Sequence, residues 1–267
     1  MTRDGAETPR FINPKPIASS GNRGYAEQQL PVFRPDWRPA IPVTPPPKRH
    51  PYDQWSPDAR ALDLVGDKWT LLIIRDLAAG PRRFVELQRV LPGISTEQLR
   101  SRLNRMVADG LLTRQRYREV PPRVDYELTE RSRALMPVIG ELARWGYDWT
   151  WGAPRQGERI DIGAVMRCGP GLLEPARSGT LECLVIGERG TDRSYVLTAA
   201  RKSVSISEQP AESPDARVTG SQSAWVRALG PDGDNGALTY EGDRALADSL
   251  LSGLIDAASG RQGRAVA

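Results

Sequence analysis

The chain has 267 residues and a formal net charge of +4, with 37 Lys and Arg, 33 Asp and Glu, and one His. This length typically corresponds to two domains, and 39% hydrophobic with 26% charged residues is the composition of a globular protein. No apolar run approaches the ~20 residues that a transmembrane helix needs, and no apolar signal-peptide core follows the N-terminus. Cys168 and Cys183 are the two cysteines of the chain, and their spacing is not that of metal ligands. Two cysteines cannot form a disulfide framework, so we expect the protein in the cytoplasm, where thiols stay reduced.

The charge is unevenly distributed along the chain. Residues 1–50 and 51–157 carry net charges of +4 and +3, whereas residues 158–267 carry −3. Seven arginines but only three acidic residues fall between Ser95 and Arg123. A basic stretch this narrow indicates a surface that faces phosphates.

Residues 1–50 are rich in proline and include Pro45-Pro46-Pro47. Because proline fixes φ and lacks a donor, neither helix nor sheet can propagate through this segment. We predict a disordered, partly polyproline-like tail, which is either inert or a partner-binding segment.

Helical periodicity begins near Ser56 and continues to Ala79, just before Gly80, a suitable residue to follow a helix end. A short helix is predicted over about 84–90, and Pro92-Gly93 then forces a turn.

Ser95-Thr96-Glu97-Gln98 is a capping-box sequence, in which Ser95 accepts from the Gln98 amide while Gln98 reaches back. It opens a predicted helix from Thr96 to about Asp109. Two β-prone runs follow, Leu112 to Arg118 and Arg123 to Leu128, separated by Val120-Pro121-Pro122. This pattern predicts a β-hairpin with a stiff, basic tip. Thr129 is placed to cap a final helix running to about Trp151, and this element order is that of a winged helix-turn-helix.

The helix from Thr96 to Asp109 divides into two faces on a helical wheel. Its buried stripe is predicted to contain Leu99, Leu103 and Met106. Its opposite face carries Gln98, Ser101, Arg102 and Arg105. Gln can pair with adenine and Arg with guanine in a major groove, while Ser95 and Thr96 at the helix start could bind a phosphate.

The hairpin places Arg114, Arg116, Arg118 and Arg123 where a wing could contact phosphates or enter a minor groove. The alternative is that these arginines only solvate a surface helix and an exposed strand. The Pro-Gly turn before the helix and the basic hairpin after it favour duplex DNA as the partner.

Several segments closely resemble regulators of the HxlR type. The run from Ser56 to Ile73, which contains Gly66-Asp67-Lys68-Trp69, resembles the start of these regulators. The further matching segments are Gly80-Pro81-Arg82-Arg83-Phe84, Glu86-Leu87, Leu91-Pro92-Gly93-Ile94-Ser95-Thr96 and Arg123-Val124-Asp125-Tyr126-Glu127-Leu128-Thr129. The resemblance covers about 100 residues. It implies a homodimer on a pseudo-palindromic DNA site, with Leu135, Ile139, Leu142 and Trp149 in dimer contacts as well as in the core.

One position departs from this family. Many relatives that sense oxidants have a cysteine immediately before the proline, where this chain has Ser56. A hydroxyl cannot form the thiolate that such chemistry needs, so thiol sensing at this position is excluded. We expect Cys168 and Cys183 to be buried or inert thiols.

Beyond a linker at 154–158 the pattern becomes α+β. A helix is predicted over 164–176, interrupted by Gly169-Pro170-Gly171. Strands are predicted at 180–186, 194–199 and 203–207, with a fourth that ends at Val218. A helix at 221–229, a strand at 237–240 and a helix at 243–255 capped by Asp243 complete the pattern.

This segment resembles a sterol carrier protein-like domain over roughly residues 160–255. The resemblance is carried by Asp215-Ala216-Arg217-Val218-Thr219-Gly220, Trp225-Val226-Arg227-Ala228-Leu229-Gly230, Gly236-Ala237-Leu238-Thr239-Tyr240-Glu241-Gly242-Asp243 and Ala245-Leu246. It implies a pocket for an apolar effector between a curved sheet and helices. The alternative is that the same alternating residues fill a small core.

The fold class that follows is a multidomain α+β protein. It comprises a disordered tail (1–50), a winged helix-turn-helix for DNA binding and dimerisation (51–153) and a smaller sterol carrier-like effector domain (158–258). The only histidine, His50, lies in the tail, and no phosphate-binding glycine loop is present. We therefore expect no catalytic residues, no cofactor and no metal site. The rival hypothesis is a lipid-binding protein whose winged helix makes protein contacts only.

Overall fold

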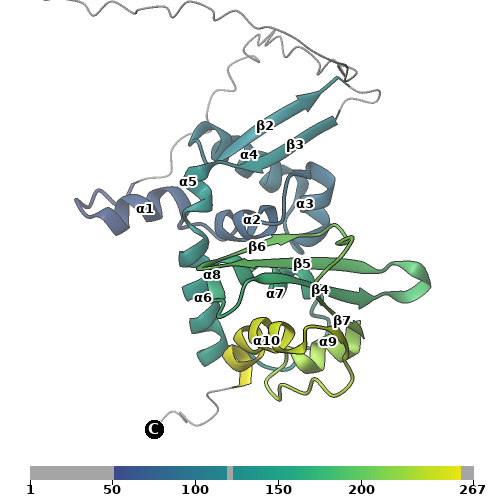
Figure 1. Ribbon diagram of the computed structural model, residues 1–267. Helices are drawn as coiled ribbons and strands as arrows, with labels where there is room; N and C mark the ends of the chain where they lie inside the picture. Colours follow the sequence, from purple (N-terminus) through teal and green to yellow (C-terminus); the bar gives the residue numbers. More distant parts are fainter. Residues whose placement is uncertain (1–50, 119–122, 260–267) are drawn as a thin grey trace, which may run out of the picture. The chain divides into compact units, whose positions relative to one another are not determined.

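The computed structural model of the chain describes residues 51–118 and 123–259. The predicted tail (1–50) and the predicted hairpin tip Val120-Pro121-Pro122 lie outside the described residues. Residues 51–259 belong to one compact unit, which contains a winged helix followed by a five-stranded sheet with helices (Figure 1). None of the helices in the described part is long and apolar enough to span a membrane.

The winged helix begins with four helices, with a short strand between the second and the third. The predicted hairpin follows, and two further helices end this part. These elements are α1 (Pro57–Val65), α2 (Thr70–Leu77), β1 (Arg82–Arg83), α3 (Phe84–Val90), α4 (Thr96–Ala108), β2 (Leu112–Tyr117), β3 (Arg123–Leu128), α5 (Glu130–Arg133) and α6 (Met136–Trp149). The helical region predicted from Ser56 to Ala79 is two helices, because the chain turns at Gly66-Asp67. Ser56 caps α1 by accepting from the Ala59 amide at 3.3 Å.

The hairpin prediction is confirmed, and the structure adds a strand to it. β2 pairs antiparallel with β3, from Leu112 opposite Leu128 to Tyr117 opposite Arg123. β1 pairs with the other edge of β3, so the sheet order is β1-β3-β2. A two-residue strand has too little alternation to be recognised in the sequence.

The prediction of a single helix from Thr129 to Trp151 is wrong, because the structure has two helices there, α5 and α6. Thr129 does cap α5, by accepting from the Ser132 amide at 3.4 Å. Pro137 lies in the first turn of α6 and has no amide hydrogen to bond back to α5, so a new helix starts there.

A continuous apolar core joins these elements. It includes the predicted stripe Leu99, Leu103 and Met106 of α4, each at most 1% exposed, packed with residues of α2, α3 and the wing sheet. α4 is therefore held by its apolar side, and its opposite side is left for other contacts.

The second part of the unit is a five-stranded sheet with helices. Its elements are α7 (Ile162–Met166), α8 (Gly169–Leu172), β4 (Gly179–Ile186), a 3-10 turn (Glu188–Gly190), β5 (Arg193–Ala200), β6 (Ser203–Ser207), β7 (Ala216–Ser221), α9 (Gln222–Ala228), β8 (Thr239–Gly242) and α10 (Arg244–Ser259). The strand order is β6-β5-β4-β7-β8, with β4 and β7 parallel and the other neighbours antiparallel.

Three predictions for this part need correction. The strand predicted at 237–240 lies at Thr239–Gly242. The helix predicted over 164–176 is two short helices, because Gly169-Pro170 starts a new one. The strand predicted to end at Val218 continues to Ser221, whose hydroxyl then caps α9 by accepting from the Ala224 amide at 3.2 Å. The Asp243 cap is as predicted, since its carboxylate accepts from the Leu246 amide at 3.0 Å.

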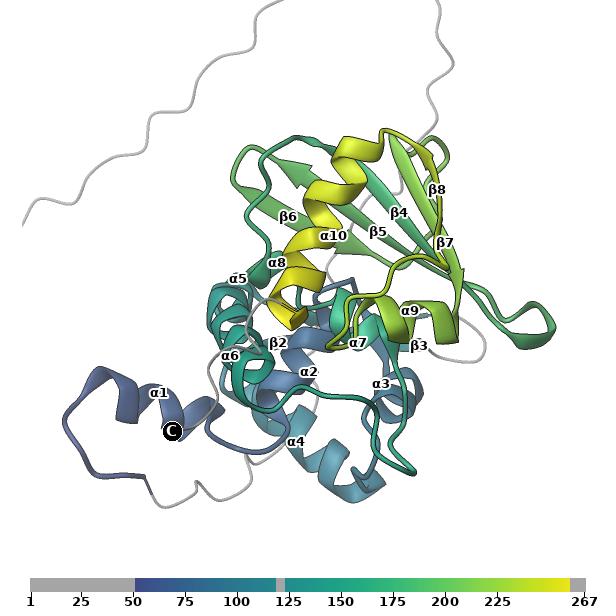
Figure 2. The same ribbon diagram turned by 90° about the horizontal axis from the view of Figure 1, so that it is seen from below.

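Helices cover one face of the five-stranded sheet, with α10 lying across it (Figure 2). The space between is filled by buried side chains, among them Trp225, which is 0% exposed and donates from its indole nitrogen to the Leu184 carbonyl. Cys183 is also fully buried there, and burial raises the pKa of its thiol. Cys168 is half-buried, and burial likewise raises its pKa, so both thiols are held protonated.

The two parts are closely joined through α6 and α8. At Gly140 and Gly171 the two helices approach so closely that a Cβ on Gly140 would overlap the Gly171 carbonyl. The Arg144 guanidinium donates to the Leu172 carbonyl at 2.7 Å, and the Trp151 indole donates to the Leu229 carbonyl at 2.9 Å.

A buried ion cluster also crosses this junction. The guanidinium of Arg167, whose side chain is 2% exposed, contacts Asp76 at 3.0 Å and Asp161 and Glu208 at 2.6 Å. Arg82 of β1 reaches the same Glu208 at 2.6 Å. Asp76 and Arg82 belong to the winged helix, whereas Asp161 and Glu208 belong to the second part, so the cluster fastens one to the other.

Candidate nucleic-acid interface

The start of α4 is fixed by the capping box that the sequence predicts. Ser95 Oγ accepts from the Gln98 amide at 3.1 Å, and Gln98 Oε1 accepts from the Ser95 amide at 3.2 Å. Thr96 is exposed, and its hydroxyl accepts from Gln88 Nε2 of α3 at 2.8 Å. The helix therefore starts at a defined position relative to α3, as a helix that enters a groove requires.

The face of α4 opposite its buried stripe is polar. Gln98 and Ser101 are exposed and Arg105 is half-buried. The capping box occupies one lone pair of the Gln98 carbonyl oxygen and sets the orientation of its amide group. A base contact by Gln98 therefore has to be made in this orientation, because turning the amide breaks the cap.

Arg102 does not lie as predicted. We expected it on the outward face of α4, but its side chain is only 17% exposed and its guanidinium lies 2.9 Å from Asp67. The side chain of Asp67 is 2% exposed, and this residue precedes α2. Arg102 therefore folds back over the domain toward a carboxylate 35 positions earlier in the chain. The attraction of a buried carboxylate outweighs the exposure that the helical wheel suggests.

Asp67 is a residue whose role our sequence reasoning missed. Its carboxylate accepts from the Trp69 and Thr70 amides at 2.9 and 3.2 Å and also from the Thr70 hydroxyl. It thus organises the start of α2 and holds Arg102 of α4 at the same time. An Asp three positions before a Thr at a helix start is a recognisable capping pattern, so the first of these roles was visible in the sequence.

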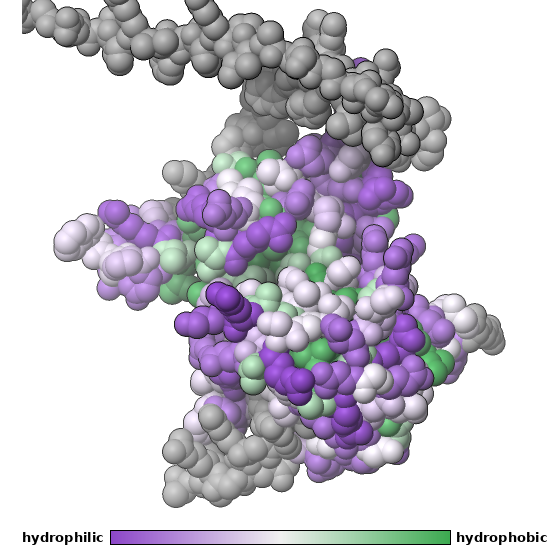
Figure 3. Space-filling view, in the orientation of Figure 1, coloured by the Kyte–Doolittle hydropathy of each residue, from purple (hydrophilic) through white to green (hydrophobic). Residues whose placement is uncertain are grey.

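The wing offers a basic surface. Arg114, Arg116 and Arg118 are exposed on or just beyond β2. Figure 3 shows that the visible surface over the wing strands and α3 is largely hydrophilic. Exposed guanidinium groups can form paired hydrogen bonds with phosphates, so this surface is chemically suited to bind a polyanion.

Arg123 differs from the other wing arginines. It starts β3, and its guanidinium pairs with Asp125 at 2.6 Å while lying 5.4 Å from the Tyr117 ring centroid. Asp125 is 3% exposed, so this arginine neutralises a buried carboxylate at the middle of the wing sheet. Arg123 lies in the wing, as the sequence predicts, but in the structure its guanidinium pairs with Asp125 of the same protein.

The residues predicted for DNA contact therefore separate into two groups. Ser95, Thr96, Gln98, Ser101 and Arg105 lie together on α4, with Arg116 and Arg118 on the neighbouring wing. Within the second group, Arg102 pairs with the buried Asp67 and Arg123 with the buried Asp125. Within the described part of the chain, no three His, Cys, Asp or Glu side chains are grouped so as to hold a metal ion.

A helix capped at a Pro-Gly turn, backed by an apolar stripe and followed by a basic hairpin defines a winged helix-turn-helix. Residues 64–153 match the family model described as HxlR-like helix-turn-helix. The chain is 43% identical over 94 residues to an HTH-type transcriptional regulator of Halalkalibacterium halodurans, covering 35% of this chain and 83% of that protein. It is 41% identical over 93 residues to one of Synechocystis sp., covering 35% of this chain and 69% of that protein.

The chain thus belongs to the HxlR-like helix-turn-helix family. This membership supports a DNA-binding regulator. Among solved structures, the reduced form of the transcriptional regulator YodB from B. subtilis is 35% identical and overlaps 36% of this chain and 96% of that chain. Its TM-score is 0.33, which is too low to carry a fold assignment.

Proposed function

We propose that this protein is a sequence-specific regulator of transcription that binds duplex DNA as a homodimer in the cytoplasm. The observation that carries the proposal is the construction of α4. Its buried stripe fixes the helix in the core, and its exposed face presents Gln98 and Ser101 beside Arg105. A helix of this kind, in a family of HTH-type regulators, is suited to lie in a major groove.

The contacts divide by chemistry. Gln98, Ser101 and Arg105 are proposed to read base edges, since Gln and Arg match adenine and guanine. Ser95 and Thr96 lie at the N-terminus of α4, where amides and hydroxyls can bind a phosphate. The exposed Arg116 and Arg118 of the wing are proposed to bind phosphates without reading sequence.

Dimerisation is proposed to use α6. Its outward residues Val138, Leu142, Trp145 and Trp149 are 50–57% exposed and recur at helical spacing along one side. Of the four residues predicted for the interface, Leu142 and Trp149 belong to this stripe, Ile139 is buried in the core and Leu135 is half-buried. An apolar stripe of this length on a surface helix indicates a protein partner, and a second copy places two α4 helices on one DNA site.

Each of the two parts of the unit is proposed to have its own function. Residues 51–153 are proposed to bind DNA and dimerise, and residues 158–258 to form a sterol carrier-like effector domain that binds an apolar small molecule. The close joint at Gly140 and Gly171 supports such a role, because a change in the second part is transmitted to α6 directly. A coupling of about 1–3 kcal/mol suffices for regulation.

The deciding experiment measures binding of the full chain to the intergenic DNA beside its own gene, at two salt concentrations and with random-duplex competitor. We expect saturable binding that survives the competitor. Ser101→Ala and Arg105→Ala should lower the preference for the specific site by about 1–3 kcal/mol where a base contact is lost. Arg116→Ala should weaken specific and random DNA alike and reduce the salt slope by about one.

Lys202→Ala is the matched control, because it removes an exposed positive charge from the second part. It should change none of these values. If neither the intergenic region nor any neighbouring promoter is preferred over random duplex, the alternative of a lipid-binding protein with a winged helix for protein contacts is favoured.

A further inference from the structure

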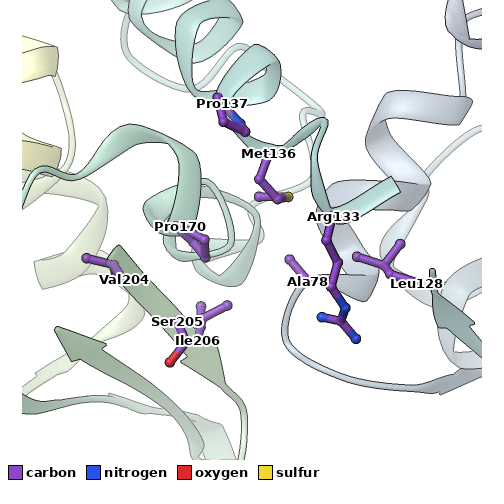
Figure 4. Close-up of a pocket in the computed structure, with 9 residues that line it drawn as sticks. All are labelled: Ala78, Leu128, Arg133, Met136, Pro137, Pro170, Val204, Ser205 and Ile206. Carbon is purple, nitrogen blue, oxygen red and sulfur yellow. The ribbon is translucent and has the colours of Figure 1, made fainter. Parts of the chain in front are cut away.

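A cleft of about 280 Å³ lies at the junction of the winged helix and the second part (Figure 4). Its lining residues are Ala78, Leu128, Arg133, Met136, Pro137, Pro170, Val204, Ser205 and Ile206. They come from the end of α2, the end of β3, the α5–α6 turn, α8 and strand β6. The cleft is thus bounded by both parts, unlike the helix-covered side of the sheet, which is filled by side chains.

Most residues that line the cleft are apolar; Arg133 is the charged residue among them, and Ser205 is polar. Leu128, Met136, Val204 and Ile206 supply buried aliphatic surface. Figure 4 shows the Arg133 side chain between Ala78 and Leu128, across the space from Ser205 and Ile206. Its side chain is 48% exposed, and its guanidinium is 3.5 Å from the Glu127 carboxylate, a long contact that an incoming anion can replace.

From this arrangement we infer that the cleft binds a small monocarboxylic acid with an apolar body, and that this acid is the effector. The carboxylate pairs with Arg133, which can hold it through two parallel hydrogen bonds, while Ser205 is among the residues that line the other side of the cleft. The apolar body lies against Met136, Val204 and Ile206.

The volume of the cleft restricts the size of the acid. At about 280 Å³ it lies just below the range of roughly 300–1,000 Å³ that is usual for drug-sized ligands. A cleft of this volume suits an aromatic acid of one ring or an alkanoic acid of medium chain length better than a sterol or a long-chain lipid. The inference therefore deepens the proposed function by replacing an unspecified apolar effector with an acid of defined size and charge.

The position of the cleft explains how binding would reach DNA. Leu128 ends the wing strand β3, Met136 begins α6, and Val204 and Ile206 belong to β6 of the second part. Glu208, two residues beyond Ile206, is a member of the buried Arg167 cluster. An acid in the cleft contacts the base of the wing, the proposed dimer helix and the second part at once, so it can favour one arrangement of the three.

The test titrates the full chain with sodium benzoate and sodium octanoate by calorimetry, with benzamide and octanol as neutral counterparts. We expect one site per chain for an acid and at least tenfold weaker binding of its neutral counterpart. Arg133→Gln should weaken acid binding about tenfold, whereas Glu127→Gln should strengthen it by releasing the guanidinium. Ser205→Trp should abolish it by filling the cleft from an exposed position.

Two matched variants control for nonspecific effects. Arg131→Gln removes a neighbouring exposed charge of α5, and Ser203→Trp adds the same bulk to β6 outside the cleft. Both should bind the acid as the unmodified chain does. The site is overturned if no acid binds up to about 10 mM, or if binding survives both Arg133→Gln and Ser205→Trp.

The role as effector rests on the proposed function and is measured separately, by DNA affinity with and without a saturating acid. We expect a change of about fivefold or more. Acid binding that depends on Arg133 but leaves DNA affinity unchanged overturns the effector role. Failure of the acid-free protein to prefer any promoter overturns the proposed function instead, and calorimetry then still decides the site.

Discussion

The Asp67 carboxylate lies 2.9 Å from the Arg102 guanidinium, and this pair ties α4 to the start of α2. Both side chains are largely removed from water, at 2% and 17% exposure. The orientation of the proposed recognition helix thus depends on an ion pair behind it as well as on its apolar stripe.

Arg102→Ala should lower the free energy of unfolding by about 2–3 kcal/mol, because it leaves a buried carboxylate without its cation. DNA affinity should fall equally on specific and random duplex, since the orientation of α4 is affected and not one base contact. Arg100→Ala is the control, because that arginine is 59% exposed in a surface pair with Glu97 and should change stability by at most about 0.5 kcal/mol. Unchanged stability with a loss at a single base pair would show that Arg102 reads a base.

Arg167→Met should be more damaging, with a loss of about 3–5 kcal/mol in urea unfolding. The substitution removes a guanidinium that contacts Asp76, Asp161 and Glu208 together. Arg193→Met tests the specificity of this effect, because Arg193 is 62% exposed and only approaches Asp161 at 3.9 Å. Similar losses for the two variants would contradict the assigned role of the cluster.

Gly140→Ala should destabilise the protein by about 1–3 kcal/mol or more, because the added methyl meets the Gly171 backbone and forces α6 from α8. Gly146→Ala on the same helix is the matched control. The nearest atom to its added methyl is Thr150 Oγ1 at 3.8 Å, so Ala should be neutral or should stabilise the helix by about 0.5–1 kcal/mol. Thermal unfolding of both variants measures the difference, and equal melting temperatures would argue against a close joint.

Leu142→Glu should convert the dimer to a monomer in analytical ultracentrifugation, because it places a charge in the middle of the exposed α6 stripe. Specific DNA binding should be lost with the dimer. Ile186→Glu changes another exposed aliphatic residue, 47% exposed on β4, and should leave the oligomeric state unchanged. A monomeric unmodified chain that still binds DNA specifically would refute the proposed interface.

Glu182 should contribute to stability in a pH-dependent way. Burial raises the pKa of this carboxyl. Hydrogen bonds from Ser194 and Arg217, together with the charge of Arg217, lower the pKa by more than burial raises it, so the net pKa lies below its ordinary value. The stabilisation is therefore present above the unfolded-state pKa and is lost as the pH falls through the folded-state pKa. In urea unfolding, the deficit of Glu182→Gln relative to the unmodified chain should be largest near neutral pH and shrink in acid. A deficit independent of pH would contradict this assignment.

Local signals in the sequence predicted most of the elements. Ser95, Thr129 and Asp243 cap helices as expected, because a capping hydrogen bond joins residues only three positions apart. The hairpin and the buried stripe of α4 follow from periodicity alone. The break between α5 and α6 was missed although Pro137 marks it, because the apolar spacing runs on across the break.

The roles of the arginines were not predictable in the same way. The helical wheel places Arg102 on the outward face of α4, yet a buried carboxylate 35 positions away draws it inward. Arg167 meets Asp76, which is 91 positions earlier, and Glu208, which is 41 positions later. A long side chain selects its partner among all the acids that the fold brings within reach.

The sequence by itself determined that this chain contains a winged helix of the HxlR type, where its helices start, and which side of α4 is buried. Only the tertiary structure decided that Arg102 and Arg123 pair with buried acids, how closely α6 meets α8, and that a cleft lies between the winged helix and the second part. The physical reason is range: caps and periodicity act over a few residues, whereas ion pairs and clefts form between segments that meet only after the chain has folded.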